Sequence, residues 1–515
     1  MSVNTISYWN LTGEKTHYPR LDQSISTDVL IIGGGITGVT CAYCLAEKGL
    51  KPVLIEAGVL ADGTTGNTTG KVTIQHAVIY YKTEEKYGLE AARDYALSQS
   101  SALDFVRNAV KKESIECQLV GNKAYIFSVN EQEWDTLGKE YATAKKIGIK
   151  AELLKNSDFP PGNKGLLGYN DQYVFHPVRY VDGLARAAVA KGAAIYCDTK
   201  AVKLENGDMK NVSCEGDITI QAKHVVMATQ YPFYDGPNLF YTRLYPKRTY
   251  GIAVHAKRDW PEGSYINAGD PSRSIRTHVE KGQRILIVVG ESHDTGRGFG
   301  AIHYDHLIEF ADEVAGVGEV IAKWSAQDYD TPDELPYIGR ISDNSNIYVA
   351  SGFRKWGLSN GTLSGMLIAE LIATGNCRYE SLYSRTRADI TSSFGKMFAG
   401  TVNPVIELVK SKVERTQDIE GLQPGEGRVV RFRGDRVGVY RDSDDNVTVL
   451  DITCTHMKTE LNFNSAEETW DCPAHGGRYN TEGKLLEGAP KDSLKVLFKG
   501  TYQELLSESM KTKNK

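Results

Sequence analysis

Apolar runs and amphipathic stretches follow one another along the first three quarters of the chain. The runs Asp28–Ile32 (DVLII), 52–56 (PVLIE) and Val225–Thr229 (VVMAT) have the length and composition of buried strands. The stretches Glu90–Lys111 and Glu131–Lys146 repeat apolar residues at the spacing of one helix face. These helical patterns, set among apolar strands, predict a part of the molecule that mixes helices and strands.

The pattern changes toward the C-terminus. Val437–Asp451 alternates apolar and polar residues around a turn, as paired antiparallel strands do. Between the two regions, Ser384–Gln417 is typical of a helical connector, in which Val405, Val409 and Val413 share one helix face. We expect this connector to pack one domain against the other. A peripheral membrane anchor is the alternative, but the segment is short for an interfacial helix.

Length and charge narrow the classes of function. A chain of 515 residues should contain more than one core, since single cores rarely exceed about 250 to 300 residues. The net charge of −5, a pI near 6.2 and the lack of a long basic block give no support to a nucleic acid or anionic membrane partner. The first residues show no secretion signal and no run of apolar residues is long enough to span a bilayer, so we expect a cytoplasmic protein.

A glycine-rich turn follows the first strand. Asp28–Ile32 leads directly into GGGITG at residues 33–38, a GxGxxG pattern between a strand and a helix. The first glycine of such a turn makes the bend, the second lets the backbone approach a pyrophosphate, and the third packs helix on strand. Glu56 ends the next strand about 20 residues later, where a carboxylate can hydrogen-bond a ribose hydroxyl. The sequence therefore predicts a dinucleotide site, and the turn alone leaves NAD and FAD open.

Two short Cys-His pairs near the C-terminus have metal-ligand chemistry. Cys454 and His456 form the first pair, and Cys472 and His475 form the second. In a Rieske 2Fe-2S cluster one iron takes two thiolates and the other takes two imidazoles, so each pair supplies one ligand of each kind. A structural zinc site is the alternative, although zinc fingers usually place a Cys pair before a His pair. The order of the ligands favours the iron-sulfur cluster and hence electron transfer.

The residues around these pairs resemble the Rieske family. Gly488-Ala489-Pro490 is similar to the proline-containing loop that covers the cluster in that family. High-potential members carry two disulfide-forming Cys where this chain has Thr459 and Ala474, and a Ser where it has Gly477, while Tyr479 stands at the usual Tyr position. The resemblance therefore implies fewer hydrogen bonds to the sulfurs and a potential near the lower end of about −150 to +300 mV.

A second resemblance covers roughly Thr27 to Thr374. Ala61–Lys71 (ADGTTGNTTGK) offers many backbone donors and hydroxyls, and it resembles the second flavin-binding segment of the D-amino-acid oxidase family of FAD enzymes. His176–Arg179, Val225–Thr229 and Leu335–Gly361 are similar to further landmarks of that family. The resemblance implies FAD as the cofactor.

Together the two resemblances imply a fold and a domain order. We expect an α/β FAD-binding Rossmann-type domain with an inserted α+β substrate domain, followed by a small antiparallel all-β Rieske domain. The expected boundaries are residues 1–383 for the oxidoreductase, 384–420 for the helical connector and 421–505 for the iron-sulfur domain. The cofactor-binding residues implied by the FAD family are Gly33, Gly35, Ile36, Thr37, Gly38, Glu56, Ala57, Thr64, Thr65, Gly66, Asn67, Thr68, Thr69, Gly70, Val202, Thr229, Gly352, Gly357, Leu358 and Ser359.

The FAD family implies hydride transfer from an amine, an amino acid or a related small molecule to the flavin. Arg354, Lys355 and Trp356 stand in the closing motif, where a cation would stabilise the reduced ring or hold a carboxylate. Arg248, beside Lys247, precedes a strand (TYGIAV) that borders the substrate cavity in the family. Solvated or salt-bridged surface cations are the alternative interpretation of each.

Other candidate side chains are less specific. His76 and His293 are possible proton acceptors, although a lone His is more often a hydrogen-bonded structural residue. No Cys or His has a position that indicates covalent flavin attachment. Amine oxidases of the family keep a Lys on a strand that faces the flavin, and the corresponding run Arg284–Gly290 (RILIVVG) has none on its inner part. This difference favours a dehydrogenase that passes single electrons to the cluster.

Two classes of function remain open from the sequence. The first is an enzyme that oxidises an amine or amino acid and exports electrons through the cluster; in a variant, the cluster feeds a flavin that acts as a reductase or oxygenase component. The second is a non-catalytic redox sensor or electron carrier. The expected partners are a small-molecule amine or amino acid and an electron-transfer partner, such as a ferredoxin-like protein, a quinone or an oxygenase.

Overall fold

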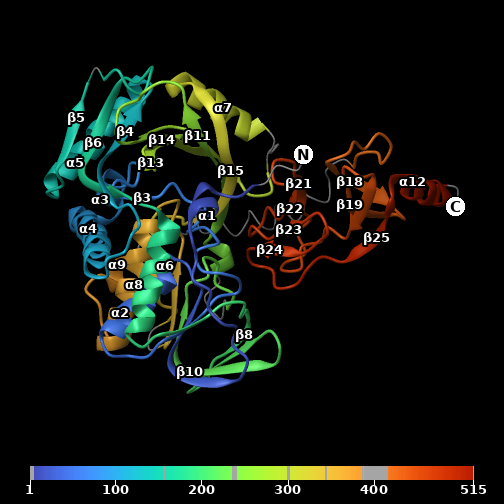
Figure 1. The fold of residues 1–515 in the computed structure, drawn as a ribbon, viewed down its shortest axis with the longest axis horizontal. Coiled ribbons are helices and arrows are strands. Elements are labelled where there is room, and N and C mark those ends of the chain that lie inside the picture. The colour runs from blue at the N-terminus through green and yellow to red at the C-terminus, as the bar shows by residue number, and fades with distance from the viewer. Residues whose placement is uncertain are drawn as a thin grey trace.

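The structure, a computed structural model, describes residues 5–155, 157–234, 240–297, 302–342, 345–385, 387 and 416–513. Two large sheets with their helices form one body, and an all-β unit made by the C-terminal residues lies beside it (Figure 1). Its inner sheet, β21 to β24, faces that body, while its outer sheet and the C-terminal helix α12 point away (Figure 1).

The first large sheet is mainly parallel. Its strands run in the order β16-β17-β10-β1-β2-β7, and β9 pairs with the first half of β10 and with β8. The last four residues of β1 are all buried, because helices and loops cover the sheet on both faces. The strands are β1 (Ile25–Ile32), β2 (Val53–Ile55), β7 (Ala194–Tyr196), β8 (Ala201–Glu205), β9 (Lys210–Cys214), β10 (Ile218–Met227), β16 (Tyr337–Arg340) and β17 (Ile347–Ser351).

Three helices pack on this sheet and on one another: α2 (Ile36–Glu47), α6 (Pro177–Ala190) and α8 (Gly357–Thr374). Small residues allow the close approach of α2 and α8. A methyl group at Gly365 would lie 2.7 Å from the backbone nitrogen of Cys41, so a larger residue would separate the helices. Helix α6 begins at Pro177, with His176 as its N-cap.

The second large sheet is mainly antiparallel and runs in the order β15-β11-β14-β13-β12-β4-β6-β3, with β5 beside β6. Only the β4–β12 pair is parallel in the registers of this sheet's described strands. Its strands are β3 (Lys71–Val72), β4 (Val120–Ser128), β5 (Ala151–Leu154), β6 (Gly165–Val174), β11 (Tyr245–Ala256), β12 (Ser264–Asn267), β13 (Ser274–Glu280), β14 (Gln283–Asp294) and β15 (Val317–Asp330).

Helices flank this second sheet. Helix α5 (Glu131–Lys146) packs against β4, β5 and β6, and α7 (Ile302–Ala315) packs against β11, β14 and β15. Helix α4 (Leu89–Lys112) contacts α3 (Tyr80–Tyr87), α6, α8 and α9 (Glu380–Tyr383), and so joins the two sheet layers. The short helix α1 (Tyr8–Thr12) touches α6 and β15, and a 3-10 turn spans Phe240–Thr242.

The C-terminal unit contains two four-stranded antiparallel sheets. The outer sheet has β18 (Glu426–Phe432), β19 (Asp435–Arg441), β20 (Asn446–Leu450) and β25 (Val496–Thr501). The inner sheet has β21 (Asn462–Asn464), β22 (Thr469–Asp471), β23 (Arg478–Asn480) and β24 (Leu485–Glu487), and helix α12 (Tyr502–Lys513) follows.

Most sequence-based expectations of the fold are confirmed. The fold class is confirmed, the helix expected at Glu131–Lys146 has those bounds, and β19 and β20 are the antiparallel pair expected from the alternation. Arg248 does not precede a strand, because β11 already begins at Tyr245, where it pairs with β15. The expected connector helix with its three valines lies outside the described residues.

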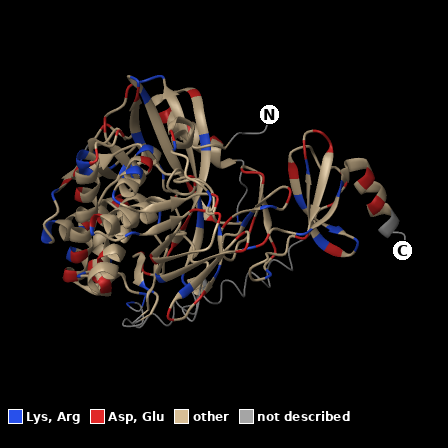
Figure 2. Ribbon diagram, turned by 60° about the horizontal axis from the view of Figure 1, so that its bottom comes forward, with Lys and Arg blue, Asp and Glu red and all other residues tan. Residues whose placement is uncertain are grey.

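Charge and hydropathy add two observations. Acidic and basic positions are interspersed along the described elements rather than gathered into a region of one sign (Figure 2). None of the helices that the structure describes has the length and apolar character needed to cross a membrane.

Candidate functional site

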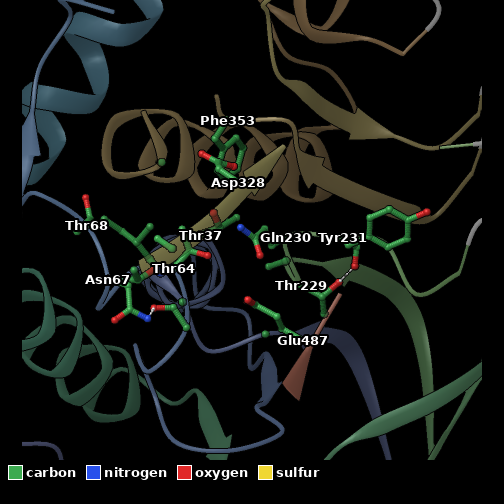
Figure 3. A pocket seen from close by; sticks show the side chains of 18 of the residues that line it. Thr37, Thr64, Asn67, Thr68, Thr229, Gln230, Tyr231, Asp328, Phe353 and Glu487 are labelled. Atoms are coloured by element: carbon green, nitrogen blue, oxygen red, sulfur yellow. Dashed lines mark hydrogen bonds between the residues drawn. The ribbon is translucent and has the colours of Figure 1, made fainter. Parts of the chain in front are cut away.

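A cavity of about 470 Å³ lies where the two large sheets and the C-terminal unit meet. This volume is within the range of about 300 to 1,000 Å³ that is usual for small-molecule and cofactor sites. Its walls come from the turn before α2, the segment that contains Thr64 to Thr69, strands of the second sheet, the start of α8 and the loop after β24 (Figure 3). Residues from both ends of the chain therefore line one space.

The glycine turn forms the floor of this cavity. Gly33 has a φ of +113°, and a Cβ there would lie 2.4 Å from the carbonyl oxygen of Ala228. A Cβ at Gly38 would lie 1.9 Å from the carbonyl oxygen of Gly33, so only glycine lets α2 start this close to β1. The N-cap residue of α2 is Gly35, which has no side chain to cap the helix, and the first residues of α2 line the cavity.

Two side chains organise the backbone around this turn. The carboxylate of Glu56 accepts hydrogen bonds from the backbone nitrogens of Gly34 at 2.6 Å and Gly58 at 2.9 Å. Burial raises the pKa of Glu56, which those backbone hydrogen bonds partly offset. The hydroxyl of Thr65 accepts a hydrogen bond of 3.1 Å from the backbone nitrogen of Ile36. Both side chains line the cavity.

Most residues that the sequence assigned to the cofactor line this cavity. They are Gly33, Gly35, Ile36, Thr37, Glu56, Ala57, Thr64, Thr65, Asn67, Thr68, Thr69, Val202, Thr229, Gly357 and Leu358. The other five lie outside this lining: a Cβ at Gly38, Gly66 or Gly70 would approach a backbone oxygen, one at Gly352 would approach the Thr331 side chain, and Ser359 Oγ lies 2.7 Å from His76 Nε2. These five are Gly38, Gly66, Gly70, Gly352 and Ser359.

The four catalytic candidates lie in different surroundings. Lys355 and Trp356 line the cavity. Arg354 instead pairs with Glu334 at 2.8 Å, and Arg248 pairs with Glu487 of the C-terminal unit at 2.6 Å. Neither arginine lines the cavity. The structure thus brings two of the four residues to the site and places a third between the domains.

The two histidine candidates are also held away from the cavity. His76 is buried, with Nδ1 2.6 Å from the Tyr95 hydroxyl and Nε2 bonded to Ser359, and burial lowers its pKa to about 3. His293 lies 3.2 Å from the Tyr250 hydroxyl through Nε2 and 2.8 Å from the carbonyl oxygen of Asp294 through Nδ1. Both rings are therefore engaged in structural contacts.

Lys71 is a cavity residue whose role the sequence did not indicate. It is 7% exposed, and its Nζ donates a hydrogen bond of 2.7 Å to Ser274 Oγ, another cavity residue. Its ammonium lies 5.4 Å from the centre of the Trp356 ring. Burial and the nearby Arg276 lower the pKa of Lys71 to about 7. Lys71 ends the segment that the sequence assigned to the flavin, but its burial depends on strands far along the chain.

Asp328 on β15 is a second buried charged residue of the cavity wall. Its Oδ1 accepts a hydrogen bond of 2.8 Å from the backbone nitrogen of Tyr329, and its Oδ2 accepts one from that of Lys355. Burial raises its pKa to about 7. Arg354 and Lys355 both have positive φ, at +50° and +69°, so Asp328 fixes an unusual loop before α8.

The two Cys-His pairs converge on two neighbouring loops of the inner sheet. The Cys454 and Cys472 thiols interact with each other, which lowers the pKa of Cys454 and raises that of Cys472. The rings of His456 and His475 lie edge to face, with centroids 5.0 Å apart. The described part of the chain holds no group of three or more His, Cys, Asp and Glu side chains arranged around one metal position. The four side chains form two pairs of one kind each.

These residues fit a 2Fe-2S cluster. Cys454, Cys472 and His475 are each 1% exposed, and the buried Nδ1 of His456 has no hydrogen-bond partner among the described residues. Tyr479 lies with its hydroxyl 3.8 Å from Cys454 Sγ. Two adjacent thiols and two adjacent imidazoles are the donor set of a Rieske centre, in which each iron takes one kind of ligand.

The proline loop connects this ligand set to the cavity. A Cβ at Gly477 would lie 2.5 Å from Cγ of Pro490 and 3.6 Å from Sγ of Cys454. Pro490 itself lines the cavity, together with Glu487, Gly488 and Lys491. Gly477 therefore lies between the proline loop and the Cys454 thiol, and the same loop forms cavity wall.

Direct contacts fix the ligand loops on the larger body. Gln327 Nε2 donates a hydrogen bond of 2.8 Å to the carbonyl oxygen of Gly476, and the Tyr329 hydroxyl donates one of 3.2 Å to that of His475. The ring of Tyr231, a cavity residue, lies edge to face with His456 at a centroid distance of 6.4 Å.

A network of buried charges holds the same interface. Arg248 and Arg478 both pair with Glu487, at 2.6 and 2.5 Å, and Arg478 also pairs with Asp471 at 3.2 Å. Glu467 is 7% exposed on its side chain and lies 3.7 Å from Arg248. Because only paired charges are tolerated at such burial, the two domains are matched to each other here.

Comparisons with known proteins agree with both parts of the chain. The family described as "FAD dependent oxidoreductase" matches residues 28–371, and the family described as "Rieske [2Fe-2S] domain" matches residues 411–497. The Bacillus subtilis (strain 168) protein YhfW, named as a Rieske 2Fe-2S iron-sulfur protein, is 35% identical over 494 residues, which are 95% of this chain and 97% of that protein.

Other similar proteins match mainly the first part of the chain, which contains the FAD dependent oxidoreductase family match. Gamma-glutamylputrescine oxidoreductase of Escherichia coli (strain K12) is 24% identical over 414 residues, covering 74% of this chain and 92% of that protein. The crystal structure of glycine oxidase from Geobacillus kaustophilus covers 70% of this chain and 99% of its own, with a TM-score of 0.59 and 20% identity. The chain therefore belongs to the FAD dependent oxidoreductase family as an enzyme of the amine and amino acid oxidase type, and it joins to that domain a Rieske domain, so that its cofactors are FAD and a 2Fe-2S cluster.

Proposed function

We propose that this protein is a dehydrogenase that oxidises a small amine or amino acid and passes the electrons one at a time to its own Rieske cluster. The observation behind the proposal is a shared wall: Pro490 borders the cavity and packs against Gly477, which lies beside the Cys454 thiol. A cavity bordered by the loop beside the cluster ligands suits electron transfer from the flavin to the cluster within one molecule.

The cofactor assignment follows from the cavity residues. We assign the pyrophosphate to the turn from Gly33 to Gly38 and the N-terminus of α2, where backbone amides and the helix dipole favour an anion. Glu56 is the candidate for the adenosine ribose, and the hydroxyls and amides of Thr64 to Thr69 are candidates for the remaining polar part. The metal ligands are Cys454, His456, Cys472 and His475.

When bound, FAD supplies a two-electron acceptor for a substrate C–H bond, and the cluster supplies a one-electron acceptor beside it. The protein contributes position and shielding. Phe353 and Trp356 form apolar wall and exclude water from the second-sheet side of the cavity. Asp328 holds the backbone of Lys355, and so fixes the loop that carries both aromatic residues.

Two residues join the cavity to the cluster ligands. The main-chain carbonyl of Gln327 accepts a hydrogen bond of 3.1 Å from Thr64 Oγ1, while its side chain donates to Gly476. Tyr231 lines the cavity and contacts His456. These contacts keep the two cofactor sites at a fixed separation, which a one-electron transfer requires.

The substrate class is drawn from the kinds of compound in the relatives' names. Glycine, other amino acids and gamma-glutamylputrescine are therefore the first compounds to test. Anaerobic addition of each to the pure holoenzyme should bleach the flavin absorbance with at least one of them and produce the EPR signal of a reduced cluster. A panel that leaves both cofactors oxidised would contradict the proposal and favour a non-catalytic electron carrier or a cluster-fed reductase.

A further inference from the structure

Lys71 is a buried amine on the cavity wall without an acidic partner in the described structure. Its amine donates a hydrogen bond to Ser274 and lies over the face of Trp356, and both of these residues line the cavity. The ion pairs of the described residues include none for Lys71. A lysine held this way is not serving a salt bridge, so its amine is available to a molecule in the cavity.

The groups around Lys71 do not favour its charged form. Arg276 and His278 lie on β13, His76 follows β3, Tyr173 lies on the neighbouring β6, and Arg354 and Lys355 precede α8. Asp328 and Asp330 are on β15, but burial raises the pKa of both carboxyl groups, and neither is among the causes of the pKa shift of Lys71.

Arg276 is the charged group that acts on Lys71, and together with burial it favours the neutral amine. Arg276 is 1% exposed and stacks on Trp9 at 4.9 Å. Burial lowers the pKa of Arg276 to about 9, so the guanidinium is still charged at neutral pH. A neutral amine carries a lone pair, which can accept a proton.

We propose that Lys71 is the base that takes a proton from the substrate's ammonium group before the substrate is oxidised; the inference rests on the proposed function. An amine is oxidised to an imine only when its nitrogen has a lone pair to form the C=N bond. Most amines carry an extra proton at neutral pH, so an enzyme of this type needs a site that removes it.

The step balances within the protein and the substrate. An N–H bond of the substrate ammonium breaks, its electron pair stays on the substrate nitrogen, and the proton bonds to Nζ of Lys71. The substrate becomes a neutral amine and Lys71 becomes an ammonium that donates to Ser274. The two electrons and the hydrogen of the substrate carbon then go to FAD, the family's oxidant.

The experiment follows flavin bleaching by stopped flow, without oxygen, between pH 6 and 10. The probe is glycine or whichever tested amine bleaches the flavin of the wild type. The wild-type rate should reach its plateau just above pH 7. In Lys71→Met it should fall by about 10²- to 10⁴-fold at pH 7, the usual contribution of a general base. Above pH 7 the rate of Lys71→Met should rise about tenfold per pH unit until the pH reaches the pKa of the free amine.

Lys71→Arg separates a base from an anion-binding cation. Arginine stays protonated in proteins, so it can hold a carboxylate but cannot accept a proton. A base predicts that Lys71→Arg behaves as Lys71→Met does. If Lys71→Arg kept the wild-type rate and pH profile, the proposal would be overturned and Lys71 would be an anchor for an anion. Lys210→Met is the matched control, because Lys210 is also 7% exposed but lies outside the cavity.

The wild-type pH profile tests the proposal even if both variants lose FAD. A rate that keeps rising to the pKa of the free amine overturns the assignment of Lys71. An enzyme that no amine bleaches instead refutes the proposed function itself. The two failures are therefore distinguishable.

Discussion

The side-chain amide of Gln327 donates a 2.8 Å hydrogen bond to the carbonyl oxygen of Gly476, the residue that follows the cluster ligand His475. Gln327 belongs to β15 of the larger body, and its own main-chain carbonyl accepts a hydrogen bond from the cavity residue Thr64. A single buried residue thus contacts both cofactor sites. The position of the cluster relative to the cavity is set by contacts of this kind.

Gln327→Leu should slow cluster reduction more than flavin bleaching. The leucine has nearly the same volume but leaves the Gly476 carbonyl and the Thr295 hydroxyl, which donates to Gln327 at 3.0 Å, without this partner. Leaving one such buried group unpaired costs about 1–3 kcal/mol. Stopped-flow absorbance resolves the two rates. Gln221→Leu is the control, because Gln221 is exposed on β10; an equal effect of both changes would refute this role of Gln327.

Gly38→Ala should yield a protein that is purified with little FAD. Its new methyl group would lie 1.9 Å from the carbonyl oxygen of Gly33, so α2 must move away from the turn. The ratio of flavin to protein absorbance measures the loss. Gly138→Ala is the matched control in α5, where nothing lies within 4 Å; it should retain FAD and gain up to about 1 kcal/mol from helix propensity. Full FAD content in Gly38→Ala would contradict the assignment.

Arg248→Met should weaken the contact between the two domains. The change leaves Glu487 and Glu467 near each other without one of their cations, and breaking a buried ion pair costs about 3–5 kcal/mol. Thermal unfolding and limited proteolysis between the domains report the change. The exposed Arg107, paired with Asp104 on α4, provides the control: Arg107→Met should leave the unfolding temperature nearly unchanged. Equal stability of the two variants would argue against a tightly docked Rieske domain.

The same network predicts a pH dependence of stability. Burial opposes ionisation of Glu487, but Arg248 and Arg478 outweigh it and lower its pKa from 4.5 to about 2. Glu487 therefore stabilises the folded state fully above about pH 4.5, and this contribution is lost as the pH falls toward 2. Urea unfolding of wild type and Glu487→Gln over that range measures it. The difference between their free energies of unfolding should shrink with falling pH, and a constant difference would contradict the pairing.

The local chemistry of both cofactor sites was predictable from the sequence. The chemistry of the turn from Gly33 to Gly38 and of the two Cys-His pairs depends on residues that are close in the chain, so a short sequence motif is enough to predict it. Even here the motif did not distinguish residues that face the cavity from those behind it. Gly38 and Ser359 were assigned to the cofactor, but Gly38 packs α2 on β1 and Ser359 bonds to His76.

The contact between the domains was not predictable in this way. Arg248 was assigned to the substrate side, but its partner Glu487 lies 239 positions away. The sequence showed Lys71 only as the end of a polar segment, because its contact residues Ser274 and Trp356 come more than two hundred positions later. Burial and charge pairing of this kind arise only when distant segments fold together, so no local sequence pattern predicts them.

The central claim is that electrons leave the flavin through the cluster of the same molecule. Mixing the holoenzyme with one equivalent of a bleaching amine, in air-saturated buffer and with freezing at successive times, tests it directly. The account predicts an EPR signal of the reduced cluster that appears as the flavin bleaches, is absent from Cys472→Ser, and comes with little hydrogen peroxide. Hydrogen peroxide formed in proportion to the amine, while the cluster stays oxidised, would contradict it.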